Sequence, residues 1–206
     1  MNGIDKVYVV HYKPLTDRKH NLMHQFEING ITNFEFCENY DRDSTPKEVM
    51  DNYFKLDNLT PAQICITISH IGIYRDIVEK GYSRCLILED DAMLCNGFSD
   101  ILNRYMETLP ANTDMAFLNN GCNLHASNSV PERVWYPETA SRTCCAYIIT
   151  KNACEKMLPT IVPFLKAIDH ELNRQIQMHS FNVYWCEPTI VTDGSESGYG
   201  SSYIRF

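Results

Sequence analysis

A continuous apolar run that ends in three acidic residues constrains this chain more than any other feature. Residues 84–88 read Arg-Cys-Leu-Ile-Leu, and Glu89, Asp90 and Asp91 follow at once. An apolar run without polar alternation predicts a strand that is buried on both faces, as in the parallel sheets of α/β proteins. Because ligands bind beyond the carboxyl ends of such strands, the acidic triplet is predicted to lie at a ligand-binding edge.

Short apolar runs alternate with helix-like segments along the rest of the chain, which favours an α/β fold. The clearest helix start is Thr60-Pro61-Ala62-Gln63, where Thr60 and Gln63 form a capping box and Pro61 suits the first turn. This helix is expected to end at Gly81. Other strands are predicted at 7–10, 34–37, 115–118, 144–149 and 181–186, and other helices at 16–29, 98–109, 151–158 and 168–179. Residues 40–59 are predicted to form a long loop or a small excursion, and loops are predicted at 120–140 and 193–202.

Length and composition limit the class of protein. The 206 residues suit one large domain, and a formal net charge of −8 makes a nucleic-acid partner unexpected. Nine cysteines without a Cys-x-x-Cys pair favour free thiols in a reducing compartment. The sequence shows neither a secretory signal nor a run of about 18 apolar residues, so we expect no transmembrane segment and a cytoplasmic location.

The acidic triplet suggests a particular chemistry. In extended geometry Glu89 and Asp91 share one face and Asp90 points to the other. Two carboxylates on one face suit Mn²⁺ or Mg²⁺, with water and phosphate oxygens as the remaining ligands, and such a metal neutralises a departing diphosphate. A solvated turn, or pairing with nearby Lys or Arg, is the alternative interpretation. Three acids at the end of a buried strand are nevertheless costly without a cation.

Several motifs in a fixed order resemble one enzyme family. The segment Leu-Ile-Leu-Glu-Asp-Asp-Ala at 86–92 is similar to the LEDD element of family 25 glycosyltransferases, which include lipooligosaccharide glycosyltransferases and collagen galactosyltransferases. At residues 11 and 12 the chain has His-Tyr where the family usually has Asn-Leu. The other segments that resemble the family, in chain order, are 11–18 (HYKPLTDR), 66–74 (ITISHIGIY), 144–150 (CCAYIIT) with Ala153, 168–172 (IDHEL), 187–191 (EPTIV) and 194–195 (GS).

This resemblance implies a GT-A fold, which is a Rossmann-like, mixed and mostly parallel sheet flanked by helices. It implies a single domain over 1–206, with a nucleotide-binding half at about 1–120 and an acceptor-side half at about 121–206. It also implies a hexosyltransferase that inverts the anomeric centre and uses a nucleotide-diphosphate sugar, most commonly UDP-galactose. The acceptor would be a hydroxyl of a glycan or glycoprotein, in a pathway such as lipopolysaccharide biosynthesis.

The same resemblance assigns roles to individual residues. Asp169, at a helix start, is the candidate general base, with Glu171 as the alternative, because transfer to a hydroxyl needs a carboxylate within hydrogen-bond reach. Asp169 as a plain helix N-cap is the other interpretation. The candidate metal ligands are Glu89, Asp91 and His170. The candidate donor contacts are His11, Tyr12, Lys13, Arg18, Ser69, His70 and Asp90. Asp193 and Ser195, with the glycines around them, either close over the donor or form a plain flexible terminus.

Two other functions remain open from the sequence. A sugar nucleotidyltransferase would share the α/β layout, but it usually needs a glycine-rich basic loop, and residues 11–18 contain no glycine. A non-catalytic domain that binds a sugar or a partner on the same fold is the second alternative. A Rossmann dehydrogenase and a P-loop kinase are excluded, because neither G-x-G-x-x-G nor G-x-x-x-x-G-K-[ST] occurs.

Overall fold

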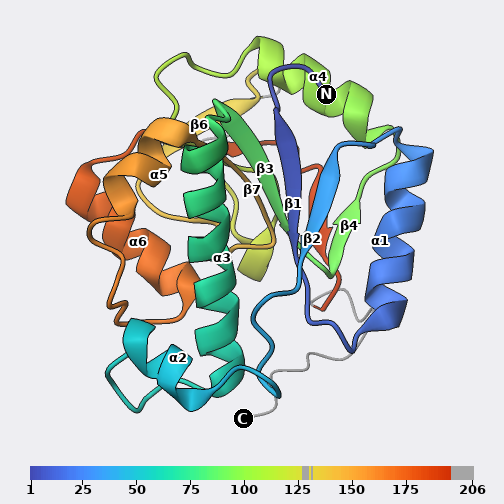
Figure 1. Ribbon diagram of the computed structural model, residues 1–206. Coiled ribbons are helices and arrows are strands. Elements are labelled where there is room, and N and C mark those ends of the chain that lie inside the picture. Colours follow the sequence, from blue (N-terminus) through green and yellow to red (C-terminus); the bar gives the residue numbers. More distant parts are fainter. Residues whose placement is uncertain (127–129, 131, 196–206) are drawn as a thin grey trace.

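A mixed β-sheet forms the centre of the molecule (Figure 1). The structure is a computed structural model, and it describes residues 1–126, 130 and 132–195. In spatial order the strands of the seven-stranded sheet are β2 (Phe34–Cys37), β1 (Lys6–Val10), β3 (Arg84–Glu89), β7 (Ala146–Thr150), β5 (Met115–Phe117), β8 (Val183–Cys186) and β6 (Trp135–Glu138). The pairings give five strands one direction and give β7 and β6 the other. The predicted mixed, mostly parallel α/β sheet is therefore confirmed.

Helices cover both faces of this sheet, because alternate residues of each strand point to opposite faces. One core packs between the sheet and α3, α5 and α6, and it includes Ile87 of β3 and Ile68 of α3. The other core packs between the sheet and α1 and α4, and it includes Leu86 and Leu88. The bounds of the helices are α1 (Thr16–Ile28), α2 (Lys47–Tyr53), α3 (Pro61–Lys80), α4 (Phe98–Glu107), α5 (Lys151–Met157) and α6 (Ile168–His179).

The long helix α3 begins and ends where the sequence predicts. The Thr60 hydroxyl accepts from the Gln63 backbone N–H at 3.3 Å, and the Thr60 N–H donates to Gln63 Oε1 at 2.9 Å. The helix ends at Gly81, whose φ of 72° is a left-handed conformation that glycine adopts without a Cβ penalty. Both ends of α3 are thus fixed by local backbone chemistry, and the helix lies across the front of the sheet in Figure 1.

Several elements differ from the predictions. The stretch 40–59 contains α2, which has no fully buried residue, although Met50 and Tyr53 pack against the core. The stretch 120–140 contains β6, an edge strand that includes Pro137, and proline is tolerated only at such positions in a sheet. Two short strands, β4 (Ala92–Leu94) and β9 (Val191–Asp193), form a separate antiparallel pair. Each of these elements depends on a tertiary partner that short-range patterns do not reveal.

The β4–β9 pair brings the late part of the chain to the acidic triplet. The Gly194 N–H donates to the Asp91 carbonyl at 2.9 Å. A Cβ at residue 194 would lie 2.5 Å from that same carbonyl oxygen, so the approach requires glycine. Of the predicted loop 193–202, residues 193–195 are described and 196–202 lie outside the described residues.

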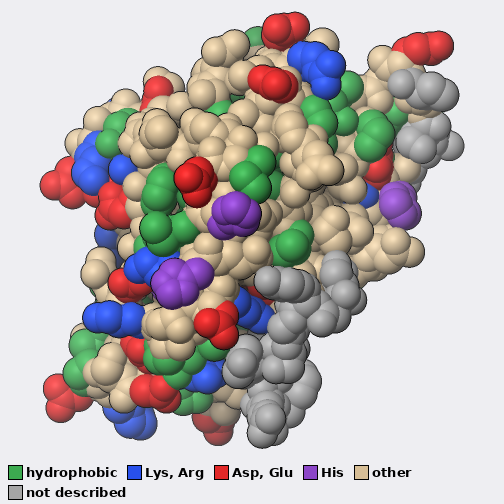
Figure 2. All heavy atoms as spheres, turned by 90° about the vertical axis from the view of Figure 1, so that its right-hand side faces the viewer, with side chains coloured by type: hydrophobic (Ala, Val, Ile, Leu, Met, Phe, Trp, Pro, Cys, Tyr) green, Lys and Arg blue, Asp and Glu red, His purple; other side chains and the backbone are tan. Residues whose placement is uncertain are grey.

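The outer surface is mixed in charge on the side that α1 covers. Figure 2 shows acidic, basic and histidine side chains interspersed on this side. Among the described residues, no helix combines the length and the apolar character that a bilayer crossing requires.

Candidate active site

A cavity of about 420 Å³ opens at the carboxyl ends of β1 and β3. The two strands are parallel and Val10 pairs with Glu89, so the residues that follow each strand meet at one edge. The N-terminal half of α3, the first turn of α6 and residues 193 and 195 also line the cavity. The charged side chains that line the cavity are Arg18, Arg42, Glu89, Asp90, Asp91, Asp169 and Asp193. Acidic groups outnumber basic groups in this set, which favours a cationic ligand.

Asp90 ties the segment after β1 to the acidic triplet. Its Oδ2 lies 2.8 Å from His11 Nδ1 and accepts from the Tyr12 backbone N–H at 3.3 Å. Its Oδ1 accepts from Arg18 Nη1 at 2.8 Å. Both carboxylate oxygens of Asp90 therefore have protein partners, and they hold three of the predicted donor contacts at the cavity wall.

The predicted opposite orientation of Asp90 and Asp91 is wrong. Both carboxylates meet the same Arg18 nitrogen, Nη1, at 2.8 Å from Asp90 and at 3.3 Å from Asp91. The reason is that β3 ends at Glu89 and the chain turns at 90–91 before β4 begins. Extended-strand alternation applies only inside a strand, so all three acids of the triplet line one cavity.

The acids of the cavity concentrate negative charge. Burial raises the pKa of Glu89 well above its usual value, and the charges of Asp91, Asp169 and Asp193 raise it further. Asp91 Oδ2 is engaged by Arg18 and by the Ser195 hydroxyl. Asp91 Oδ1 and Asp169 Oδ1 are buried, and the described residues give neither of them a hydrogen-bond partner. Buried carboxylate oxygens without a donor are suited to a hard divalent cation.

The described residues do not form a closed metal cage. They include no group of three or more His, Cys, Asp or Glu side chains placed to hold a metal ion by themselves. Sites for Mg²⁺ and related ions that act on phosphates commonly use one or two carboxylates, and water and phosphate oxygens complete the coordination. Glu89 and Asp91 fit that open type of site.

The three candidate residues of α6 have different surroundings. Asp169 lines the cavity from the first turn of the helix, and Ala167 rather than Asp169 is the N-cap. His170 is exposed and does not line the cavity. Glu171 is fully buried, and it accepts from Arg174 Nε at 2.8 Å and from Gln175 Nε2 at 3.0 Å. Among these three, Asp169 alone is placed to face a ligand in the cavity.

The predicted donor contacts on the segment after β1 and on α3 also differ in whether they line the cavity. Tyr12 lines the cavity, whereas Lys13 is exposed and does not. Ser69 lines the cavity, but its hydroxyl donates to the Cys65 carbonyl of its own helix at 2.9 Å. His70 is fully buried behind the cavity wall, where its Nδ1 lies 2.7 Å from the Tyr147 hydroxyl.

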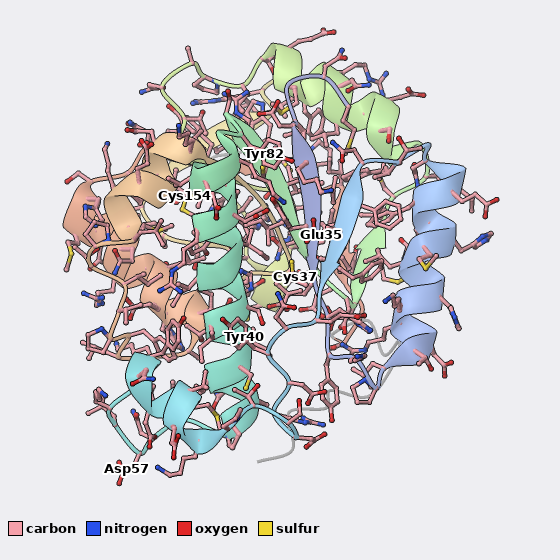
Figure 3. The ribbon with its side chains drawn as sticks, viewed as in Figure 1. Glu35, Cys37, Tyr40, Asp57, Tyr82 and Cys154 are labelled. Atoms are coloured by element: carbon pink, nitrogen blue, oxygen red, sulfur yellow. The ribbon has the colours of Figure 1, made fainter. Side chains whose placement is uncertain are left out.

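Sequence reasoning missed two residues of the polar stretch 40–59. Tyr40 lines the cavity, and Figure 3 shows it beside α3, where it contacts the position of Gly72. Arg42 also lines the cavity, and its guanidinium lies 4.3 Å from the centre of the Tyr12 ring. The missed signal is topological: β2 is parallel to β1, so the residues after β2 reach the same edge.

The far wall of the cavity comes from the predicted long loop and the residues before β7. Thr143 and Cys122 line it with φ values of 63° and 55°, which are left-handed and uncommon for residues with a side chain. Asn119 Nδ2 donates to the Arg142 carbonyl and to Thr143 Oγ1, each at 2.7 Å. Arg142 is itself fully buried and pairs with Glu187 at 2.6 Å. This network fixes the backbone of the wall.

The fold and the acidic cavity at the carboxyl edge define a GT-A-like α/β protein. Residues 4–172 match the family described as "Glycosyltransferase family 25 (LPS biosynthesis protein)". Since this match covers most of the chain, the chain belongs to glycosyltransferase family 25.

Two known proteins illustrate the relationship. The chain is 23% identical over 214 residues to the procollagen lysyl hydroxylase and glycosyltransferase of Acanthamoeba polyphaga mimivirus, in an alignment that covers 89% of this chain. It spans only 22% of that relative's length. A crystal structure of a glycosyltransferase involved in the glycosylation of the major capsid of PBCV-1 has a TM-score of 0.52 at 13% identity, covering 91% of this chain and 92% of that one. The latter similarity supports the fold.

Proposed function

We propose that this glycosyltransferase moves a hexose from a nucleotide-diphosphate sugar to a hydroxyl of a glycan or protein, with inversion and with a divalent metal. A UDP-sugar such as UDP-galactose is the favoured donor, on the basis of the family resemblance. The observation that carries the proposal is one cavity lined by Glu89, Asp91 and Asp169. The same cavity thereby offers a site for a metal diphosphate and a separate carboxylate for the acceptor.

The carboxylates of Glu89 and Asp91 suit a divalent cation. Asp91 Oδ1 is buried without a hydrogen-bond partner among the described residues, and the Glu89 carboxylate lies beside it in the same field of negative charge. Mn²⁺ or Mg²⁺ held there would neutralise the charge that builds on the leaving diphosphate. Arg18 adds a fixed positive charge beside Asp91 and the neighbouring Asp90.

The remaining wall suits the nucleoside part of a donor. Tyr12, Tyr40 and Ile66 give planar and apolar surface, and Arg42 lies over the Tyr12 ring. A nucleobase can stack on such a surface while its edge hydrogen-bonds to backbone groups. The cavity volume of about 420 Å³ is in the usual range for ligands of a few hundred daltons.

Asp169 supplies the base for the transfer step. Asp169 lines the cavity and its buried Oδ1 has no hydrogen-bond partner among the described residues, so this carboxylate is available to take the proton of the attacking hydroxyl. The acceptor oxygen forms a bond to the anomeric carbon as the bond from that carbon to the diphosphate oxygen breaks. The proton passes to Asp169, and the electron pair of the broken bond leaves with the nucleoside diphosphate.

The free thiols of the cysteines support a reducing compartment as the location of this reaction. All nine cysteines are free, and six of them are buried. Because oxidising compartments favour disulfides, we include a reducing, cytoplasmic setting in the proposal.

A thermal-shift titration against a panel of nucleotide sugars tests the proposal. At a ligand concentration of about 100 times Kd, binding to the native state contributes about 2.7 kcal/mol, which raises the Tm by about 5–10 °C for a chain of this size. We expect such a shift with one donor in the presence of Mn²⁺ and a much smaller shift with EDTA. The absence of any shift across the panel, with or without metal, would favour a non-catalytic binding domain.

A further inference from the structure

His70 belongs to a buried polar chain that begins in the core and ends at the acidic wall. It lies on α3, and its ring stacks on Tyr147 of β7 with ring centres 5.8 Å apart. His70 Nδ1 is 2.7 Å from the Tyr147 hydroxyl, and that hydroxyl is 2.7 Å from the hydroxyl of Tyr74. His70, Tyr74 and Tyr147 are all fully buried. A core that needed only volume would not hold three linked polar groups at this cost.

The other ring nitrogen of His70 faces the cavity acids. His70 Nε2 is buried without a hydrogen-bond partner among the described residues, and Glu89 Oε1 lies 3.8 Å from it. That separation is longer than a hydrogen bond, but Glu89 has three side-chain torsions and its carboxylate lines the cavity. A small rotation of the Glu89 side chain brings the oxygen within reach of the imidazole.

The two tyrosines determine which ring nitrogen carries the proton. His70 is fully buried, and burial disfavours the charged imidazolium, so the neutral ring with one N–H is the favoured form. If Tyr74 donates to Tyr147 and Tyr147 donates to Nδ1, both hydroxyl protons are used and the ring proton is on Nε2. In the reverse order the Tyr74 hydroxyl has no acceptor among the described residues. The first order satisfies more groups.

We propose that His70 is a positioning residue, whose Nε2–H, fixed by the Tyr74–Tyr147 hydroxyl chain, holds the Glu89 carboxylate in its working orientation. The role of that carboxylate as a metal ligand rests on the proposed function, whereas the direction of the hydrogen bonds from Tyr74 through Tyr147 to His70 does not. Carboxylates that bind metals are themselves commonly oriented by such outer hydrogen bonds. His70 thus acts behind the cavity wall rather than on the donor.

Histidine NMR of the metal-free protein tests the proton position directly. In long-range ¹H–¹⁵N spectra of histidine-labelled protein, we expect His70 to be a neutral ring protonated on Nε2. Its signal is identified by its loss in His70→Gln and, independently, by contacts with the Tyr147 ring protons. In Tyr147→Phe the donor to Nδ1 is lost, so the Nδ1-protonated form should become detectable. An imidazolium, or a wild-type ring protonated on Nδ1, would overturn the proposal.

Two substitutions at residue 70 separate positioning from packing. The amide of His70→Gln can place an N–H near the position of Nε2, whereas that of His70→Asn reaches only the position of Nδ1. Measured by calorimetry in the presence of UDP, the Mn²⁺ affinity of His70→Asn should fall by about 10–100-fold, and that of His70→Gln should fall less. Equal losses in two variants with equal Tm would contradict a positioning role. If the wild type shows no metal-dependent binding, the proposed function is refuted, and the NMR result still stands.

Discussion

Asp91→Asn is expected to abolish metal-dependent donor binding while the chain stays folded. In the native site Asp91 Oδ2 faces Arg18 and the Ser195 hydroxyl, and Oδ1 is buried without a hydrogen-bond partner among the described residues. An amide at this position should direct its oxygen toward the guanidinium, since an amide NH₂ beside Arg18 would place donor against donor. Its NH₂ then points to the metal position and cannot act as a ligand. The Mn²⁺ affinity should fall by more than the roughly 10–100-fold that is typical when a residue that hydrogen-bonds to a metal ligand is substituted.

Calorimetric titration of Mn²⁺ in the presence of UDP measures this effect. The matched control is Asp57→Asn, which removes the same charge at an exposed position after α2, well away from the sheet (Figure 3). Asp57→Asn should bind like the wild type, and both variants should have a wild-type Tm within a few degrees. If Asp91→Asn binds the metal as tightly as the wild type, Asp91 is not a metal ligand.

Asp169→Asn is expected to reduce kcat by at least about 100-fold, the scale of general-base catalysis, and to leave donor binding intact. The amide keeps the size of the side chain but cannot accept the proton of the acceptor hydroxyl. Asp169 lies on α6 and is not one of the proposed metal ligands, so the metal and the nucleotide should still bind. The Kd for UDP with Mn²⁺ should stay within about threefold of the wild type, since no contact that this step requires is lost.

Glu171→Gln is the matched comparison for the base. Glu171 is buried and paired with Arg174 and Gln175, so its substitution should mainly affect stability. The free energy of unfolding, measured in urea, should fall, while kcat of the folded protein should change little. Breaking a buried ion pair by removing one partner typically costs about 3–5 kcal/mol. A small change in kcat for Asp169→Asn, together with a large change for a folded Glu171→Gln, would transfer the base to Glu171.

The parts of the fold that the sequence predicts are those with strong local signals. The strand β3 follows from an unbroken apolar run, and α3 follows from the capping box at Thr60 and the glycine at 81. The carboxyl-edge rule then places the acids after β3 beside the residues after β1, as the structure confirms. These inferences succeed because their causes lie within a few residues of one another or in a general rule of sheet topology.

The parts that escaped prediction depend on distant partners. The β4–β9 pair joins residues about a hundred positions apart, and it alone explains why Gly194 and Ser195 reach Asp91. The orientation of the acidic triplet required knowledge of the turn at 90–91. His70 was predicted to contact the donor because its motif lies on the helix before the triplet, yet that helix turns it toward Tyr147. A helical position alone does not specify which neighbour a side chain meets.

Cleavage of the donor, followed by ³¹P NMR, tests the central claim most directly. Water can take the place of the acceptor, so the wild-type chain with a panel of nucleotide sugars and Mn²⁺ should release the intact nucleoside diphosphate from one donor. Release should stop with EDTA or in Asp91→Asn, and it should fall by at least about 100-fold in Asp169→Asn. Release of a sugar 1-phosphate, or cleavage that neither EDTA nor these two substitutions reduce, would contradict glycosyl transfer at this cavity.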